Sequence, residues 1–98
     1  MQKFVVIQQS PAPDVYFSAN PVKVSLDTST TNHSIILTYD EGMQLRLQCV
    51  FEGNDFTQNH VDVINAAIAQ CWKQGFTDST IDITDDIPLT GIALTQIV

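Results

Sequence analysis

The sequence has little positive charge. Four lysine and arginine residues stand against eleven aspartate and glutamate residues, which gives a formal net charge of −7 at neutral pH. A chain with this balance cannot neutralise a run of phosphates or bind an anionic membrane surface through charge alone. We therefore expect no direct contact with nucleic acid and none with a membrane.

Long apolar runs are also missing. The first residues, MQKFVVIQQSP, contain one lysine and then four consecutive apolar residues, fewer than the roughly 7 to 15 of a signal-peptide core. No stretch approaches the ~20 apolar residues that a membrane-spanning helix needs. The sequence thus predicts a protein of the cytoplasm, unless it belongs to a particle of the kind considered below.

The motifs of common catalytic and cofactor sites are absent. The sequence contains no GxSxG, P-loop, HExxH or glycine-rich dinucleotide motif. His60 and Asp62 lie two positions apart on a predicted helix, so their side chains point in different directions and cannot act on one ligand. Cys49 and Cys71 show no metal-site spacing and lie on apolar faces, which favours buried, unreactive thiols. We predict that the protein is not an enzyme and that it has no catalytic residue, no cofactor and no metal site.

The composition indicates a single small domain, residues 1–98. Apolar residues make up 44% of the chain and charged residues 15%, against roughly 25% charged residues in an average domain. A chain of this length buries roughly 60 to 65% of its extended surface, which is enough for one core. Its exterior must consist mostly of neutral polar side chains.

Alternation of apolar and polar residues predicts most of the strands. The clearest is a hairpin in which the arms Ser34–Tyr39 and Met43–Phe51 flank Asp40–Gly42, where Gly42 can adopt the positive φ of a tight turn. In its second arm alternate residues fall on the core side, namely Met43, Leu45, Leu47, Cys49 and Phe51. Further strands are predicted around FVVI (4–7), VKVSL (22–26), the Ile81/Ile83 pair and IALTQIV (92–98).

Residues 57–74 change to helical spacing. Val61, Ile64, Ile68, Cys71 and Trp72 lie on one face, Thr57 or Asp55 can cap the start, and Gly75 with Phe76 matches a glycine cap at the end. We predict an α+β fold in the order β-β-β-β-α-β-β, with a mostly antiparallel sheet that packs one face against this helix. The central contacts are expected to be Leu45, Leu47, Ile64, Ile68 and Trp72. His60, near the helix start, is expected to have a surface or capping role.

Two segments carry apolar side chains that the predicted core does not obviously absorb. The predicted loop 10–21 contains Val15, Tyr16 and Phe17, which either pack back on the domain or contact a partner. The last strand can form a sheet edge, where it would be open to a neighbour, or can pair inside its own sheet. The candidate interface residues are Tyr16, Phe17, Leu94, Ile97 and Val98.

An acidic cluster lies between the helix and the last strand. Asp78, Asp82, Asp85 and Asp86 supply the oxygen ligands that Ca²⁺ prefers. Their spacing does not match an EF-hand loop, so a solvated acidic rim is the favoured interpretation and a cation site the other.

Several stretches resemble small structural proteins of tailed bacteriophage virions: the start QKFVVI, Ser/Thr-rich strands, the single helix VDVINAAIAQ and the closing strand PLTGIALTQI. The resemblance implies a role in a capsid, neck or tail, and it transfers no site residue. We expect a non-catalytic assembly protein that self-associates or docks on a larger particle, located in the virion. The alternative is an acidic inhibitor or adaptor that binds a basic surface through Asp78–Asp86 and Glu41.

Overall fold

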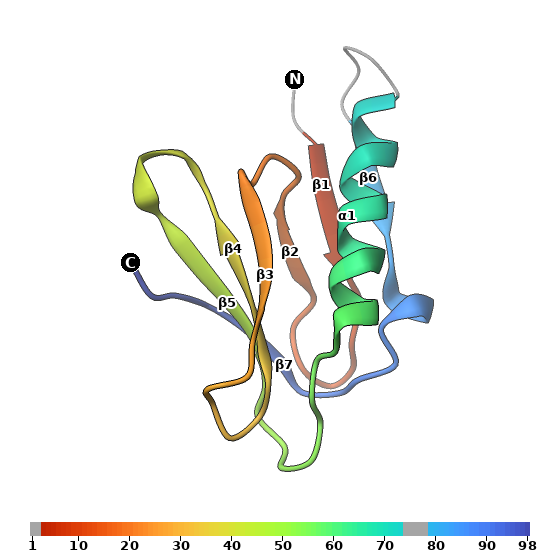
Figure 1. Cartoon of the computed structure of the whole chain (residues 1–98). Coiled ribbons are helices and arrows are strands. Elements are labelled where there is room, and N and C mark those ends of the chain that lie inside the picture. Colours follow the sequence, from red (N-terminus) through yellow and green to blue (C-terminus); the bar gives the residue numbers. More distant parts are fainter. Residues whose placement is uncertain (1–2, 74–78) are drawn as a thin grey trace.

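The computed structural model of the chain describes residues 3–73 and 79–98 (Figure 1). Its elements are β1 (Lys3–Ile7), β2 (Val15–Ser18), β3 (Lys23–Asp27), β4 (Ser34–Thr38), η1 (Asp40–Gly42), β5 (Gln44–Cys49), α1 (Gln58–Lys73), β6 (Ser79–Asp82), η2 (Thr84–Asp86) and β7 (Ile92–Gln96).

The strands form two sheets rather than one. The first has the order β2-β1-β6, with β1 and β2 antiparallel and β1 and β6 parallel. The second, β3-β4-β5-β7, is antiparallel throughout. The α+β class is therefore confirmed, with a helix packed against mostly antiparallel strands, while the division into two sheets differs from the single sheet that we predicted.

Strand β2 lies inside the segment that we predicted to be a loop. Val15 and Phe17 point into the core and Tyr16 points to solvent, with 63% of Tyr16 exposed. Phe17 is only 3% exposed, so its side chain is part of the core and is not available to a partner as we had suggested. The strand is short and lies between prolines at 13 and 21, which is why its period-two pattern does not stand out in the sequence.

The predicted hairpin is present. β4 and β5 pair with Leu37 opposite Leu45 and Ile35 opposite Leu47. Gly42 has a φ of +83°, and Glu41 also lies in the left-handed region, at +67°. Met43 and Phe51, which we placed on the core side, are exposed because they lie beyond the two ends of β5.

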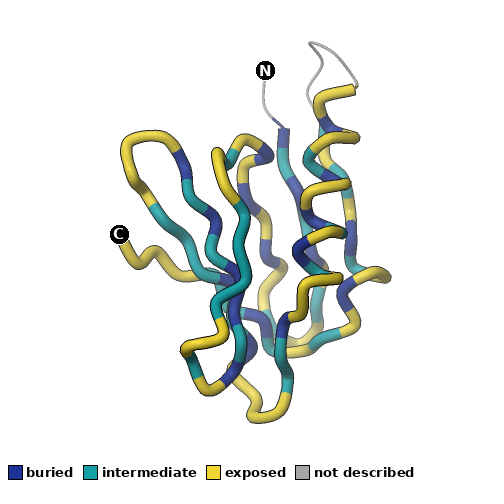
Figure 2. The backbone as a smooth tube through the Cα atoms, in the orientation of Figure 1, coloured by how far each residue is buried: buried dark blue, intermediate teal, exposed yellow. Residues whose placement is uncertain are grey.

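The helix closes one side of the core. α1 packs against β1, β3 and β6, and its exposed face is visible in Figure 2. Ile68 is half-buried and packs against the core. Among the described residues no helix is long and apolar enough to cross a membrane. The proposed cap at Gly75 and Phe76 lies outside the described residues. The buried face of α1 consists of Val61, Ile64, Ala67 and Cys71.

Trp72 has a different role from the one we predicted. It is 46% exposed and is not a central core residue. Its indole Nε1–H donates a 2.6 Å hydrogen bond to the carbonyl of Ala19, just after β2, and the Lys3 ammonium lies 5.3 Å from the ring centre. Trp72 thus ties the end of the helix to the first sheet.

The start of α1 is capped by His60. Its Nδ1 accepts a 3.0 Å hydrogen bond from the Thr57 amide, while the His60 amide donates to the Thr57 carbonyl. Asp55 does not cap the helix, because its Oδ1 accepts a hydrogen bond from the His33 amide. Burial lowers the pKa of His60, in keeping with a neutral ring that accepts a hydrogen bond. Of the surface or capping role predicted for His60, the structure shows the capping contact.

One apolar core lies between the two sheets and the helix. Each large side chain buried there contributes roughly 1.5 to 3 kcal/mol. Its fully buried members come from both sheets, from the helix and from the connections: Val5, Ile7, Ile35, Leu37, Leu47, Cys49, Phe56, Ile64, Cys71 and Ile87.

Replacing Ile64 by alanine should destabilise the domain by about 2 to 5 kcal/mol, because it leaves a cavity where the helix meets the core. Urea unfolding followed by circular dichroism measures the change. Asn65→Ala is the matched control on the exposed face of the same helix and should stay within about 0.5 kcal/mol of the wild type. Equal effects of the two variants would contradict the orientation of α1.

Stability should fall as the medium becomes acidic, because the folded state disfavours protonated His60. The contribution of neutral His60 to the free energy of unfolding is complete above the pKa of histidine in the unfolded chain, about 6.5. It is lost as the pH falls through the lower pKa that His60 has in the folded state. His60→Gln keeps a hydrogen-bond acceptor at this position but does not titrate, so its stability should change less between pH 7.5 and 5.5. Urea midpoints at several pH values test this, and parallel curves would refute it.

Candidate functional site

β7 forms one edge of the second sheet, with β5 as its neighbour on the other side. The Val50 amide donates to the Gly91 carbonyl, and the Ile97 amide donates to the Gln44 carbonyl. Since hydrogen-bonded positions alternate along an antiparallel pair, Ala93 and Thr95 also direct their backbone groups toward β5. The backbone groups of Ile92, Leu94 and Gln96 therefore point away from the sheet.

At Ile92 a side chain closes this edge. Gln9 Oε1 accepts a 3.0 Å hydrogen bond from the Ile92 amide, and Gln9 Nε2 donates a 2.7 Å bond to the Ile92 carbonyl. The side-chain amide group of Gln9 therefore pairs with the backbone of Ile92 as a neighbouring strand would. The same Nε2 donates to the carbonyl of Pro13, and the Gln9 amide donates to Asp14 Oδ1. Gln9 joins the turn between β1 and β2 to the second sheet.

Beyond Ile92 the edge is open. In the described part of the chain, no group pairs with the outward amide and carbonyl groups of Leu94 and Gln96. Residues 92–98, IALTQIV, contain neither a charged residue nor proline. Natural sheet edges are usually protected by such residues, by bulges or by a covering element. The open part of β7 is therefore suited to accept another strand.

A groove runs between this edge and β2. It has a volume of about 370 Å³, and its walls are mostly apolar. Where the sheets diverge further along β2, the Tyr39 hydroxyl donates a 2.7 Å hydrogen bond to the Ser18 carbonyl, and burial raises the pKa of Tyr39 to about 12. The groove is lined by Pro13, Asp14, Val15, Tyr16, Ile92, Ala93 and Leu94.

The structure brings most of the candidate interface residues to this region. Tyr16 and the half-buried Leu94 line the groove from opposite sides. Ile97 is 38% and Val98 66% exposed at the other end of the edge, where Val98 shares a shallow hollow with Met43. Gln9 was not predicted, because nothing in the sequence signals a contact with a residue 83 positions away.

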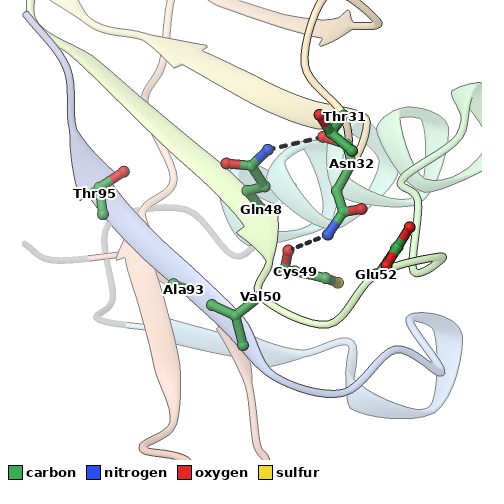
Figure 3. Close-up of a pocket in the computed structure, with 8 residues that line it drawn as sticks. All are labelled: Thr31, Asn32, Gln48, Cys49, Val50, Glu52, Ala93 and Thr95. Atoms are coloured by element: carbon green, nitrogen blue, oxygen red, sulfur yellow. Dashed lines mark hydrogen bonds between the residues drawn. The ribbon is translucent and has the colours of Figure 1, made fainter.

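A second hollow, of about 670 Å³, lies on the outer face of the second sheet (Figure 3). Asn32 Nδ2 donates to the carbonyls of Cys49 and Phe51, and Gln48 Nε2 donates to the Asn32 carbonyl. These amides hold the loop before β4 against β5, so they are not free to bind a ligand. Glu52 adds a carboxylate to the lining, which also includes the buried Cys49 thiol and the hydroxyls of Thr31 and Thr95.

The two thiols are buried, as predicted. Burial, with a smaller contribution from the charge of Asp55, raises the pKa of Cys49 to about 11. Cys71 Sγ lies 3.6 Å from the Phe4 carbonyl beneath the helix. Since the thiolate is the reactive form, the burial and the raised pKa of Cys49 both disfavour reaction of this thiol at neutral pH.

The acidic segment is engaged locally. Asp82 Oδ1 accepts hydrogen bonds from both the amide and the hydroxyl of Thr84, and these bonds lower the pKa of Asp82. Asp85 and Asp86 are exposed in η2, and Asp78 lies outside the described residues. Across residues 3–73 and 79–98, no group of three or more His, Cys, Asp or Glu side chains is placed to hold a metal ion.

Comparison with known proteins found no matching family model, no matching curated protein and no matching solved structure. The function must therefore be argued from the chemistry of this chain, and its most distinctive feature is the partly closed edge of β7.

Gln9→Glu should destabilise the fold by about 1 to 3 kcal/mol, because a carboxylate cannot donate to the Ile92 and Pro13 carbonyls. Gln8→Glu introduces the same charge at an exposed neighbour and is the control. Thermal unfolding of the two variants measures the difference. Below the usual glutamate pKa of about 4.3 the protonated side chain regains a donor, so the gap should narrow. Equal melting temperatures at neutral pH would show that the Gln9 contact is unimportant.

Proposed function

We propose that this chain is a non-catalytic structural or assembly protein that acts through protein–protein contacts, as a component of a phage virion such as its capsid, neck or tail. The observation that carries the proposal is the open, uncharged edge of β7. Exposed apolar side chains lie along it, and an apolar groove runs beside it.

The distribution of charge supports an interface at this edge. The chain has eleven acidic residues and a net charge of −7, yet residues 87–98 contain no charged residue. Interface centres are depleted in charged side chains relative to the rest of a protein surface. Asp14 reaches the groove, but its carboxylate already accepts the Gln9 amide. The edge is thus the part of the surface best suited to contact another protein.

The virion assignment rests on the resemblance of QKFVVI, VDVINAAIAQ and PLTGIALTQI to small structural proteins of tailed phages. A one-domain chain with a neutral-polar exterior suits a subunit that repeats in a capsid, neck or tail. Self-association or docking on a larger particle would place the protein in the virion. Without that role, the cytoplasm is the expected location.

A second candidate function is that of an acidic inhibitor or adaptor. The exposure of Asp85 and Asp86 in η2, and of Asp40 and Glu41 at the hairpin turn, favours this alternative. These groups could face a basic surface of a partner protein. Binding of that kind weakens steeply as salt screens the charges, whereas an interface built on apolar burial does not.

Light scattering after size exclusion should show reversible self-association over a hundredfold concentration range, and the oligomer should persist in 1 M salt. At that ionic strength the Debye length is only about 3 Å, so mutual repulsion of the acidic subunits is screened and association should hold or strengthen. A strict monomer under all conditions would contradict self-assembly and would favour the acidic adaptor.

A further inference from the structure

We propose that the partner of β7 is a second copy of the same chain, paired antiparallel about a two-fold axis with Leu94 of each copy opposite Gln96 of the other. This inference rests on the proposed assembly function and names its partner and register. In the paired state the Leu94 amide donates to the Gln96 carbonyl of the second copy, and the Leu94 carbonyl accepts the Gln96 amide of that copy. The same two bonds form on the other side of the axis.

The register follows from which backbone groups are free. Placing Leu94 opposite Leu94 would set Gln96 against Ile92 of the second copy, whose amide and carbonyl already bond Gln9. Placing Gln96 opposite Gln96 would set Leu94 against Val98, whose carbonyl already accepts the Gln44 amide. The register of Leu94 against Gln96 uses both open positions and disturbs neither existing bond.

Side chains along the strand fit this register. The axis passes beside Thr95, so the two small hydroxyl side chains face each other on the outer face of the sheet. Ile97 then lies opposite Ala93 of the second copy, where the small alanine leaves room. Ala93 also lines the groove beside β2. The exposed Ile97 of each copy can therefore be buried against the groove of the other.

The pattern favours a second copy over an unrelated extended peptide because it is self-complementary. The open positions are two residues apart, symmetric about Thr95, and each copy offers both a projecting apolar residue and a receiving groove. Pairing would join the β3-β4-β5-β7 sheets of two copies into one continuous sheet. No charged residue of β7 enters the contact, although each copy carries a net charge of −7.

A cysteine at the axis tests the register directly. Non-hydrogen-bonded antiparallel neighbours have Cα atoms about 4.5 Å apart, within the disulfide range of roughly 4.4 to 6.8 Å. Thr95→Cys should therefore form a covalent dimer under mild oxidation. Ser25→Cys, on the same outer face but on β3, should not. The native thiols, Cys49 and Cys71, are buried and do not compete.

A proline at residue 96 tests the hydrogen bonds. Gln96→Pro removes an amide that points away from β5, so the pairing of β5 with β7 is kept, as edge prolines allow. We expect the dissociation constant of the dimer to rise at least about tenfold, because residue 96 of each subunit can no longer donate to the Leu94 carbonyl of the other, so one of the two exchanged bonds is lost on each side of the axis. Gln96→Ala keeps the amide and should dimerise as the wild type does. Circular dichroism confirms that each variant is folded.

The outcomes separate this inference from the proposed function. Cross-linking of Thr95→Cys but not of Ser25→Cys, with weakening by Gln96→Pro but not by Gln96→Ala, supports the pairing. A wild-type chain that oligomerises while the Thr95 variant fails to cross-link overturns the β7 register and leaves assembly standing. A chain that stays monomeric and never cross-links overturns both. If Gln96→Pro fails to fold, the cross-linking result alone decides the register.

Discussion

The two sheets share one apolar core but no strand, and this constraint governs the rest of the structure. Each sheet ends in strands whose backbone groups need partners or cover. On one side α1 packs against β1, β3 and β6, so the helix covers the opening between the sheets there. On the other side β2 and β7 diverge, and single hydrogen-bonding side chains connect the sheets. Gln9 joins to Ile92 and Tyr39 to Ser18.

These two contacts differ in what they leave open. Gln9 satisfies the backbone of Ile92 completely at the narrow end of the opening. Tyr39 satisfies the Ser18 carbonyl of β2 but reaches no group on β7. The unpaired part of β7 at Leu94 and Gln96 therefore follows from the divergence of the sheets. An interface at this edge would use a property that the fold already has, without requiring a dedicated loop or pocket.

The sequence predicted the features that depend on local periodicity. The hairpin around Gly42, the helix at Gln58–Lys73, the core position of Cys49 and the α+β class all follow from spacing within a short window. It did not predict what depends on distant contacts. The four residues of β2 give too few alternations to stand out, and the exposure of Trp72 depends on where the helix ends relative to Ala19.

The candidate site illustrates the same limit. The exposure of Tyr16, Ile97 and Val98 agrees with the hypothesis of an interface, whereas Phe17 is buried because alternation in β2 sends it inward.

Which backbone groups of β7 are free could not be predicted, since that depends on the register with β5 and on Gln9. A strand with unprotected backbone groups and no charge is a liability unless something covers it. Gln9 covers Ile92 alone. The open stretch that remains, from Leu94 to Gln96, is just long enough for reciprocal pairing about Thr95. This limited length favours a closed pair over an open-ended stack, because once two edges have met neither offers a further free position.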